Sequence, residues 1–296
     1  MILDHLKSVL QDPPPSLAFE ISESGIAVAK IGSKAELDFQ PLKPGTLSIS
    51  PLKENIVDPD DFADAVRQLT ASQNPRKRKD VALILPDFST RITVLDFDNF
   101  PSDAKEQLAL IKFRLKRSVP FDVETAAISY FPQTSAAKKM DVVVVVTPFE
   151  IVARYEAPFR AVGMNPGLVT MSGLAALELA PEAGLTVTAK LTGHVLTVLV
   201  RQKNVLKLVR CLELPSPDLE DVAGVLLPTF VYVEDNLGGR AERLMLCGFG
   251  QGTTAAQHRF EADLGVEVEP LRSTLGMPGE HDAGLLGYLR SIARNN

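Results

Sequence analysis

The chain has 296 residues, of which 45% are hydrophobic and 23% are charged, and this composition is ordinary for a soluble globular protein. A chain of this length can bury one large core or two smaller ones, and two lobes are the better expectation. The formal net charge of −6 argues against nucleic acid as a partner, because contacts to phosphates need a basic face.

The first residues predict an amphipathic helix and a proline linker over residues 1–16. Ile2, Leu6 and Val9 have helical spacing, and Pro13–Pro15 end the helix. We expect its apolar stripe to pack against the rest of the protein, with a membrane or a partner as the alternative. The segment lacks the pattern of a signal peptide, and no apolar run is long enough for a membrane span. This favours a cytoplasmic protein.

The segment Leu17–Ile31 predicts two short strands joined by a tight turn. Apolar residues alternate with a period of two on both sides of the polar turn Ser22–Gly25. Gly25 is expected to supply the positive φ that such a turn demands. A second segment of the same kind lies at about Leu185–Val200, so a β-hairpin is expected to open each half of the chain.

Between these two segments the sequence alternates strands and helices. An edge strand is expected before Pro51, and Asp58 followed by Pro59 predicts the start of a helix. Strands are also expected over Val81–Pro86, Arg91–Phe97, Ala126–Phe131 and Asp141–Thr147, with a helix from Pro101 to about Arg117. The valine run after Asp141 must be covered on both faces. Thr147–Glu150 predict the start of a further helix, and Pro158 inside it should kink or split it.

The second half predicts a three-stranded meander over residues 185–214 and a helical region to about Leu237 that Pro228 interrupts. A buried strand, then a helix, a strand and a final helix follow, at Leu244–Cys247, about Thr254–Leu264, Val266–Pro270 and Ala283–Arg294. Each half thus combines a sheet with helices and opens with a hairpin, which indicates two α/β lobes with a cleft between them. The two cysteines are expected to be buried thiols, and no two histidines have the spacing of metal ligands. We expect no metal site.

Several pieces of the sequence follow the order of motifs in the type IV pilus assembly protein PilM family, which the chain resembles from about Leu17 to Arg290. The pieces are VALILPDFSTRITVLDF, IKFRLKRSVPFDVETAAISYF, DVVVVVTPFEIVARYEAPFRAVGMNP, LGGRAERLMLCGFGQG and GLLGYLRS. The resemblance implies an α/β, actin-like (ribonuclease H-like) two-lobed fold related to the cell-division protein FtsA. Residues 17–80 and 148–184 would form the first lobe, 81–147 an inserted α+β subdomain, and 185–296 the second lobe.

In this fold two facing hairpins hold the phosphates of a nucleotide, and the resemblance places that site on Glu20, Ser22, Ser24, Gly25, Gly193, Gly248 and Gly250. The acid of the first hairpin, Glu20, is one methylene longer than the usual aspartate, and Glu23 adds negative charge where a polyphosphate would lie. The second hairpin, Leu185–Val195, contains no Asp or Glu, so its acid is lost. We expect no catalytic residue, while binding of ATP with magnesium stays open.

The resemblance also implies that the inserted subdomain binds the cytoplasmic N-terminal tail of an inner-membrane partner, PilN, in a groove. The predicted helix that ends near Arg117 has an apolar and basic outer stripe that suits a partner segment, although core packing explains part of it. The residues expected to bind the partner are Lys112, Phe113, Lys116, Pro120 and Phe121.

The resulting hypothesis is a cytoplasmic scaffold at the inner face of the inner membrane, which joins other proteins of a type IV pilus platform and reaches the membrane through its partner. The alternative is an active actin-like ATPase or a sugar-kinase-like phosphotransferase, and the missing acid in Leu185–Val195 argues against it. A third candidate is the actin-like part of a type II secretion platform protein.

Overall fold

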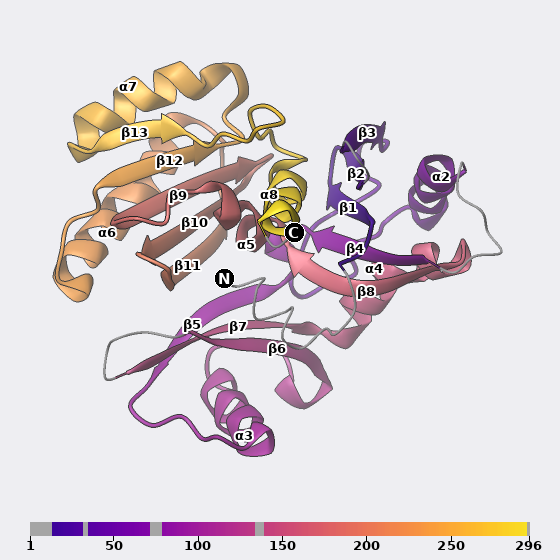
Figure 1. Cartoon of the computed structure of the whole chain (residues 1–296), viewed down its shortest axis with the longest axis horizontal. Coiled ribbons are helices and arrows are strands. Elements are labelled where there is room, and N and C mark those ends of the chain that lie inside the picture. The colour runs from indigo at the N-terminus through magenta and orange to yellow at the C-terminus, as the bar shows by residue number, and fades with distance from the viewer. Residues whose placement is uncertain (1–13, 32–34, 72–78, 134–138, 295–296) are drawn as a thin grey trace.

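The computed structural model describes residues 14–31, 35–71, 79–133 and 139–294, which form two α/β lobes and a smaller subdomain (Figure 1). The helix expected over residues 2–10 and most of the basic run Pro75–Lys79 lie outside these ranges. Within the described residues, no helix is both long and apolar enough to span a bilayer.

The first lobe is built on a five-stranded sheet with the order β3-β2-β1-β4-β8. Its strands are β1 (Leu17–Ser22), β2 (Gly25–Lys30), β3 (Glu36–Pro41), β4 (Lys79–Leu85) and β8 (Met164–Met171). β1 to β3 are antiparallel, whereas β1, β4 and β8 run parallel. Helices α2 (Pro59–Thr70) and α4 (Phe149–Ala161) pack on one face, which carries Phe19 and Leu83. The opposite face, with Ala18 and Ile84, packs on the C-terminal helix α8 (Ala283–Ala293).

The first hairpin forms as expected, but glycine is needed at position 25 for a different reason from the predicted one. Ser22 pairs with Gly25, so the turn consists of Glu23 and Ser24, and Gly25 already belongs to β2. Gly25 is not among the glycines with a positive φ. A Cβ there would lie 2.4 Å from Gln40 O and 2.4 Å from a ring carbon of Phe39. Glycine is therefore needed for the close approach of β3 and not for the turn.

The inserted subdomain is a three-stranded antiparallel sheet with the order β5-β7-β6, covered by α3 (Figure 1). The elements are β5 (Arg91–Phe97), α3 (Ala104–Leu115), β6 (Ala126–Gln133) and β7 (Met140–Pro148). Val142, Val144 and Val146 form a core with α3, and Val143 joins the core of the first lobe, so the valine run is covered on both faces as expected. Val81–Leu85 belongs to β4 of the large sheet, so the subdomain begins near Arg91 and not at Val81.

The second lobe has a five-stranded sheet with the order β11-β10-β9-β12-β13. The expected meander is confirmed as β9 (Leu185–Thr192), β10 (Val195–Gln202) and β11 (Val205–Glu213), followed by β12 (Arg243–Cys247) and β13 (Glu267–Pro270). Helices α6 (Leu219–Leu237) and α7 (Thr253–Leu264) share a core with one face of this sheet. Short 3₁₀ turns occur at Asp87–Ser89, Val123–Thr125, Leu177–Leu179 and Gly250–Gly252.

Neither internal proline splits its helix. α4 runs through Pro158 and α6 runs through Pro228. A proline removes one backbone hydrogen bond, and buried side chains on both sides of each proline offset that loss, among them Tyr155 and Phe159 in α4. The expected split at Pro158 and interruption at Pro228 were therefore wrong.

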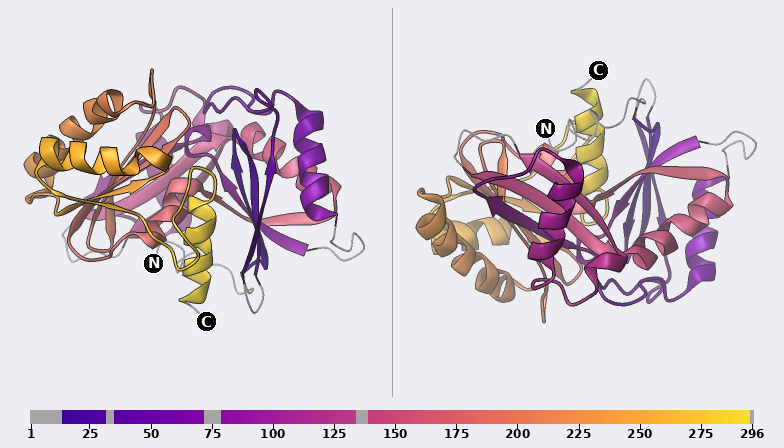
Figure 2. Two further views of the ribbon diagram at one scale, coloured as in Figure 1. Left: turned by 90° about the horizontal axis from the view of Figure 1, so that it is seen from above. Right: turned by 90° about the horizontal axis from the view of Figure 1, so that it is seen from below.

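Helix α8 does not belong to the second lobe, although the sequence prediction assigned residues 185–296 to it. The chain crosses back after β13, and α8 packs beside the first sheet and against α5 (Ser172–Ala176), between the two large sheets (Figures 1 and 2). Two glycines permit this close packing. A Cβ on Gly284 would lie 2.9 Å from the Cα of Ser172, and one on Gly287 would lie 2.0 Å from Ala175 O.

The inserted subdomain also contacts the second lobe. The side-chain amide of Gln133, at the end of β6, donates to Leu206 O (2.8 Å) and accepts from Leu206 N (2.7 Å). At the start of β7, Asp141 accepts a hydrogen bond from the ammonium of Lys207 at 2.6 Å. The subdomain therefore bridges both lobes next to the cleft.

Candidate functional site

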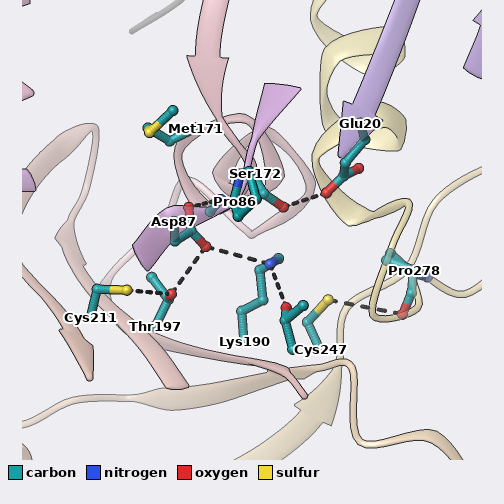
Figure 3. A network of polar contacts seen from close by, with 12 residues as sticks. Glu20, Pro86, Asp87, Met171, Ser172, Lys190, Thr197, Cys211, Cys247 and Pro278 are labelled. Carbon is teal, nitrogen blue, oxygen red and sulfur yellow. Dashed lines mark hydrogen bonds and ion pairs between the residues drawn. The ribbon is translucent and has the colours of Figure 1, made fainter. Parts of the chain in front are cut away.

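A buried polar network joins the two lobes at the bottom of the cleft (Figure 3). On the side of the first lobe, Glu20 lies near the end of β1 and is 1% exposed. Ser172 Oγ donates to one of its carboxylate oxygens, and the backbone N–H of Leu285 donates to the other at 2.7 Å. Glu20 is thus held by the first residue of α5 and by the first turn of α8.

Asp87 is the second acid of this network, and it follows β4 directly after Pro86. Its Oδ1 accepts from the backbone N–H of Gly173 at 2.7 Å. Its Oδ2 accepts from Thr197 Oγ1 of the second lobe at 3.0 Å and forms an ion pair with Lys190 Nζ at 3.4 Å. Both carboxylate oxygens therefore have partners, and two of those partners come from the opposite lobe.

Lys190 supplies the positive charge. It lies in β9, its side chain is 3% exposed, and its Nζ also donates to Thr192 Oγ1 at 2.8 Å. Burial on its own lowers the pKa of a lysine, but the charges of Asp87 and Glu20 outweigh that effect and raise the pKa of Lys190. The ammonium is therefore charged at neutral pH.

Burial has the opposite effect on the pKa of Glu20. Desolvation raises its pKa above 4.5, and the nearby charge of Lys190 and the hydrogen bonds from Ser172 and Leu285 offset this only in part. Burial also raises the pKa of Cys247, which lies nearby, to about 12, so its thiol stays protonated and inert, as the sequence analysis expected.

Above the network lies a cavity of about 560 Å³ between the turns of the two hairpins. Glu23 and Ser24 line it from the first turn, and Thr192 and Gly193 from the second. The carboxylate of Glu23 accepts from Ile49 N at 3.3 Å and lies close to Gly193, where a Cβ would come within 3.7 Å of it. The two turns thus face each other across the cavity, as two phosphate-binding hairpins would.

The predicted nucleotide residues separate into two groups. Glu20, Ser22, Ser24 and Gly193 line this cavity, whereas Gly25, Gly248 and Gly250 are not among its lining residues. Ser22 Oγ is engaged by Gly25 O and Ser24 Oγ, both at 3.0 Å. Gly248 has a φ of +80°, and a Cβ there would lie 1.9 Å from Leu191 O, so it permits close packing of the chain against β9. That packing explains the glycine without a nucleotide.

The residues around this cavity do not fit magnesium and a polyphosphate. Its lining includes the acids Glu20, Glu23, Asp87 and Glu280, with Lys190 as the one cation among the described lining residues. Both oxygens of Asp87 and of Glu20 are already bound by protein donors. In the part of the chain that the structure describes, no group of three or more His, Cys, Asp or Glu could hold a metal ion.

A second cavity, of about 370 Å³, lies between the inserted subdomain and the first lobe. Val143, Val145 and Thr147 of β7 line it, together with their register partners on β6, which are Phe131, Ser129 and Ala127. Val169, Thr170 and Met171 of β8 and Val152 of α4 line it from the first lobe. We call this cavity the β6–β8 groove. Among the described residues, β6 and β8 are each the last strand of their sheet.

The five predicted partner-binding residues lie on the other side of the β5-β7-β6 sheet, with α3. Phe113 is exposed at 67%, and Pro120 is also exposed. Lys112 and Lys116 both pair with Glu124, at 2.7 Å and 3.2 Å. Phe121 packs against the core of the subdomain. None of the five is among the described residues that line the β6–β8 groove.

The sequence analysis missed Asp87, Ser172, Lys190 and Thr197. A signal for Asp87 exists, because it follows a buried strand, and the carboxyl ends of parallel strands are where α/β sheets place ligand-binding residues. Lys190 also stands out, as the one charged residue of the buried strand β9. The sequence gives no sign that these residues meet.

Solved structures with this fold include the following two. One is a PilM–PilN type IV pilus biogenesis complex, to which the chain is 18% identical with a TM-score of 0.75, over 95% of this chain and 99% of that chain. The other is a protein of unknown function with an actin-like ATPase fold from Bacteroides thetaiotaomicron, with 12% identity, a TM-score of 0.60, and coverage of 96% of this chain and 97% of that chain. No protein-family model and no curated protein sequence matches the chain. The expected actin-like fold, and the resemblance to PilM at the level of the fold, are confirmed.

Proposed function

We propose that this actin-like protein is a scaffold that binds an extended peptide in the β6–β8 groove, and that the peptide is the cytoplasmic tail of an inner-membrane protein similar to PilN. The protein would then reach the inner face of the membrane through this partner and join other proteins of a pilus or secretion platform. The observation that carries the proposal is the groove itself, an apolar cavity of about 370 Å³ between two edge strands.

The chemistry of the groove favours an extended apolar segment. Its floor is made of the valines of β7 that face the first lobe, and β6 and β8 are edge strands of their sheets among the described residues. A peptide that adds to such an edge gains main-chain hydrogen bonds and places alternate side chains in the groove. The resemblance to the PilM–PilN complex supports a PilN-like partner as the occupant.

The interlobe site supports a role without ATP hydrolysis. Hydrolysis of a nucleotide needs neutralisation of phosphate charge and a positioned water. Here the two acids nearest the cleft are bound by protein groups, and Glu23 and Glu280 add negative charge to the cavity wall. An active ATPase or phosphotransferase would need this network to open and rearrange.

Peptide binding tests the proposal. A fluorescent peptide with the tail sequence of the PilN-like protein from the same genome is titrated with the wild type and with Ala127→Trp, which fills the groove from the half-buried face of β6. The matched control is Phe113→Ala, on the opposite side of the same subdomain. We expect Ala127→Trp to weaken binding at least about tenfold, or 1.4 kcal/mol, and Phe113→Ala to leave it unchanged. The reverse pattern would move the binding site to the α3 side, where the sequence analysis placed it.

A further inference from the structure

Lys190 occupies an unusual position for a lysine. It lies in β9 of the second lobe, on the hairpin where an actin-like nucleotide site would carry its second acid, and it is 2% exposed. Its ammonium reaches across the cleft to Asp87 of the first lobe at 3.4 Å. Fully buried lysines are rare, and those that persist are paired with opposite charges.

Lys190 and its partner Asp87 are surrounded by polar groups from both lobes. Asp87 is held by the N–H of Gly173 and by the hydroxyl of Thr197 as well as by Lys190 (Figure 3). Glu20 lies within electrostatic range of the same ammonium. Without Lys190, Asp87 and Glu20 would have no positive charge among the described residues that line the cavity.

We propose that the ammonium of Lys190 is a permanent cation that holds the two lobes together, in place of a bound ligand between them. Its side chain balances the acids of the first lobe from within the second lobe. The arrangement of the lobes then needs neither nucleotide nor metal. This proposal concerns the Lys190–Asp87 contact between the lobes and is independent of peptide binding in the β6–β8 groove.

The proposal predicts a binding site that can be created by truncation. Lys190→Ala removes three methylene groups and the ammonium, which together correspond to n-propylammonium. The space left behind is lined by Asp87, Glu20 and Thr192, which accept hydrogen bonds and favour a cation. A primary alkylammonium ion of this length should therefore bind the variant and stabilise it. Tetramethylammonium carries the same charge but has no N–H donor.

The experiment measures the Tm of the full chain with n-propylammonium chloride and, in parallel, with tetramethylammonium chloride at equal ionic strength. Lys190→Ala is compared with Lys190→Met, which fills the space without charge, and with Val187→Ala, a buried truncation on the same strand. We expect both Lys190 variants to lose about 5–15 °C in Tm, because one partner of a buried pair has been removed. Only Lys190→Ala should regain several degrees, and only in n-propylammonium.

Equal Tm values of Lys190→Ala in the two salts would overturn the proposal, and so would an equal gain by Val187→Ala. If Lys190→Ala does not fold in either salt, a second comparison decides. The double variant Asp87→Asn with Lys190→Met removes both charges, so it should be more stable than Lys190→Met alone. A double variant that loses the sum of the two single effects would show that Lys190 acts by packing and not by charge. Peptide binding in the groove is measured separately, so the two proposals can fail independently.

Discussion

Substituting Gly287 by alanine tests the packing that brings α8 to the interlobe site. In α8, a Cβ at this position would lie 2.0 Å from Ala175 O and 2.6 Å from the attached carbonyl carbon. Both are backbone atoms of α5, so no side chain can rotate away, and one helix has to move. Because α8 also presents the N–H of Leu285 to Glu20, the displacement should reach the buried network.

The size of the effect follows from two opposing terms. Alanine is better than glycine in a helix by about 1 kcal/mol. Overpacking of a tight contact costs about 1–3 kcal/mol, and a backbone contact this short places Gly287→Ala at the upper end of that range. We expect a net loss of about 1–2 kcal/mol in the free energy of unfolding, seen as a fall of about 2–8 °C in Tm by differential scanning calorimetry.

Gly224→Ala is the matched control, because Gly224 also lies inside a helix, α6. It is exposed, and a Cβ there would meet nothing within 4 Å. The same substitution should therefore stabilise the protein, by about 0.5–1 kcal/mol. If Gly287→Ala raised Tm as Gly224→Ala does, the close packing of α8 on α5 would be refuted.

Three further predictions concern the interlobe site. Asp87→Asn should lower the free energy of unfolding, measured by chemical denaturation, by about 3–5 kcal/mol, because it breaks a buried ion pair. The control Asp80→Asn, on the exposed end of β4, should change it by less than about 0.5 kcal/mol. Similar losses in the two variants would contradict the network. Burial raises the pKa of Glu20 above its unfolded value near 4.5. The contribution of Glu20 to stability is therefore complete below that pH and declines as the pH rises. Glu20→Gln should remove this decline, and parallel Tm–pH curves for the variant and the wild type would contradict the prediction. Millimolar Mg-ATP should shift the wild-type Tm by less than about 1 °C, whereas a ligand at 100 times its Kd would add about 2.7 kcal/mol and be readily seen.

Local elements were predictable from the sequence because their signals are local. Period-two alternation located the hairpin of β1 and β2 and the meander of β9 to β11. The run of valines in β7 correctly implied cover on both faces. The order of motifs then supplied the fold, which periodicity alone could not have given.

The buried network was not predictable, because its members are far apart in the chain. Glu20, Asp87, Ser172, Lys190 and Leu285 meet only once both lobes have formed and α8 has returned to the first sheet. No periodic pattern encodes such long-range contacts. The sequence analysis noted that the second hairpin contains no Asp or Glu, but it did not recognise that Lys190 of that hairpin pairs with Asp87 of the first lobe.

The same limit applies to the surface of the inserted subdomain. Phe113 and the basic residues of α3 suggested a partner site because they cannot all point inward. The β6–β8 groove lies on the other face of the sheet, where it meets β8, a strand that follows α4. Which face of a sheet stays open depends on how the subdomain docks, and the sequence carries no direct record of that.

Amide hydrogen exchange with and without the tail peptide tests the central claim most directly. If the peptide lies in the β6–β8 groove as an added strand, amides along the outer edge of β6 or β8 should exchange more slowly when it is bound, while those of α3 keep their rates. Slower exchange confined to α3, or unchanged rates at both strand edges under saturating peptide, would contradict the account.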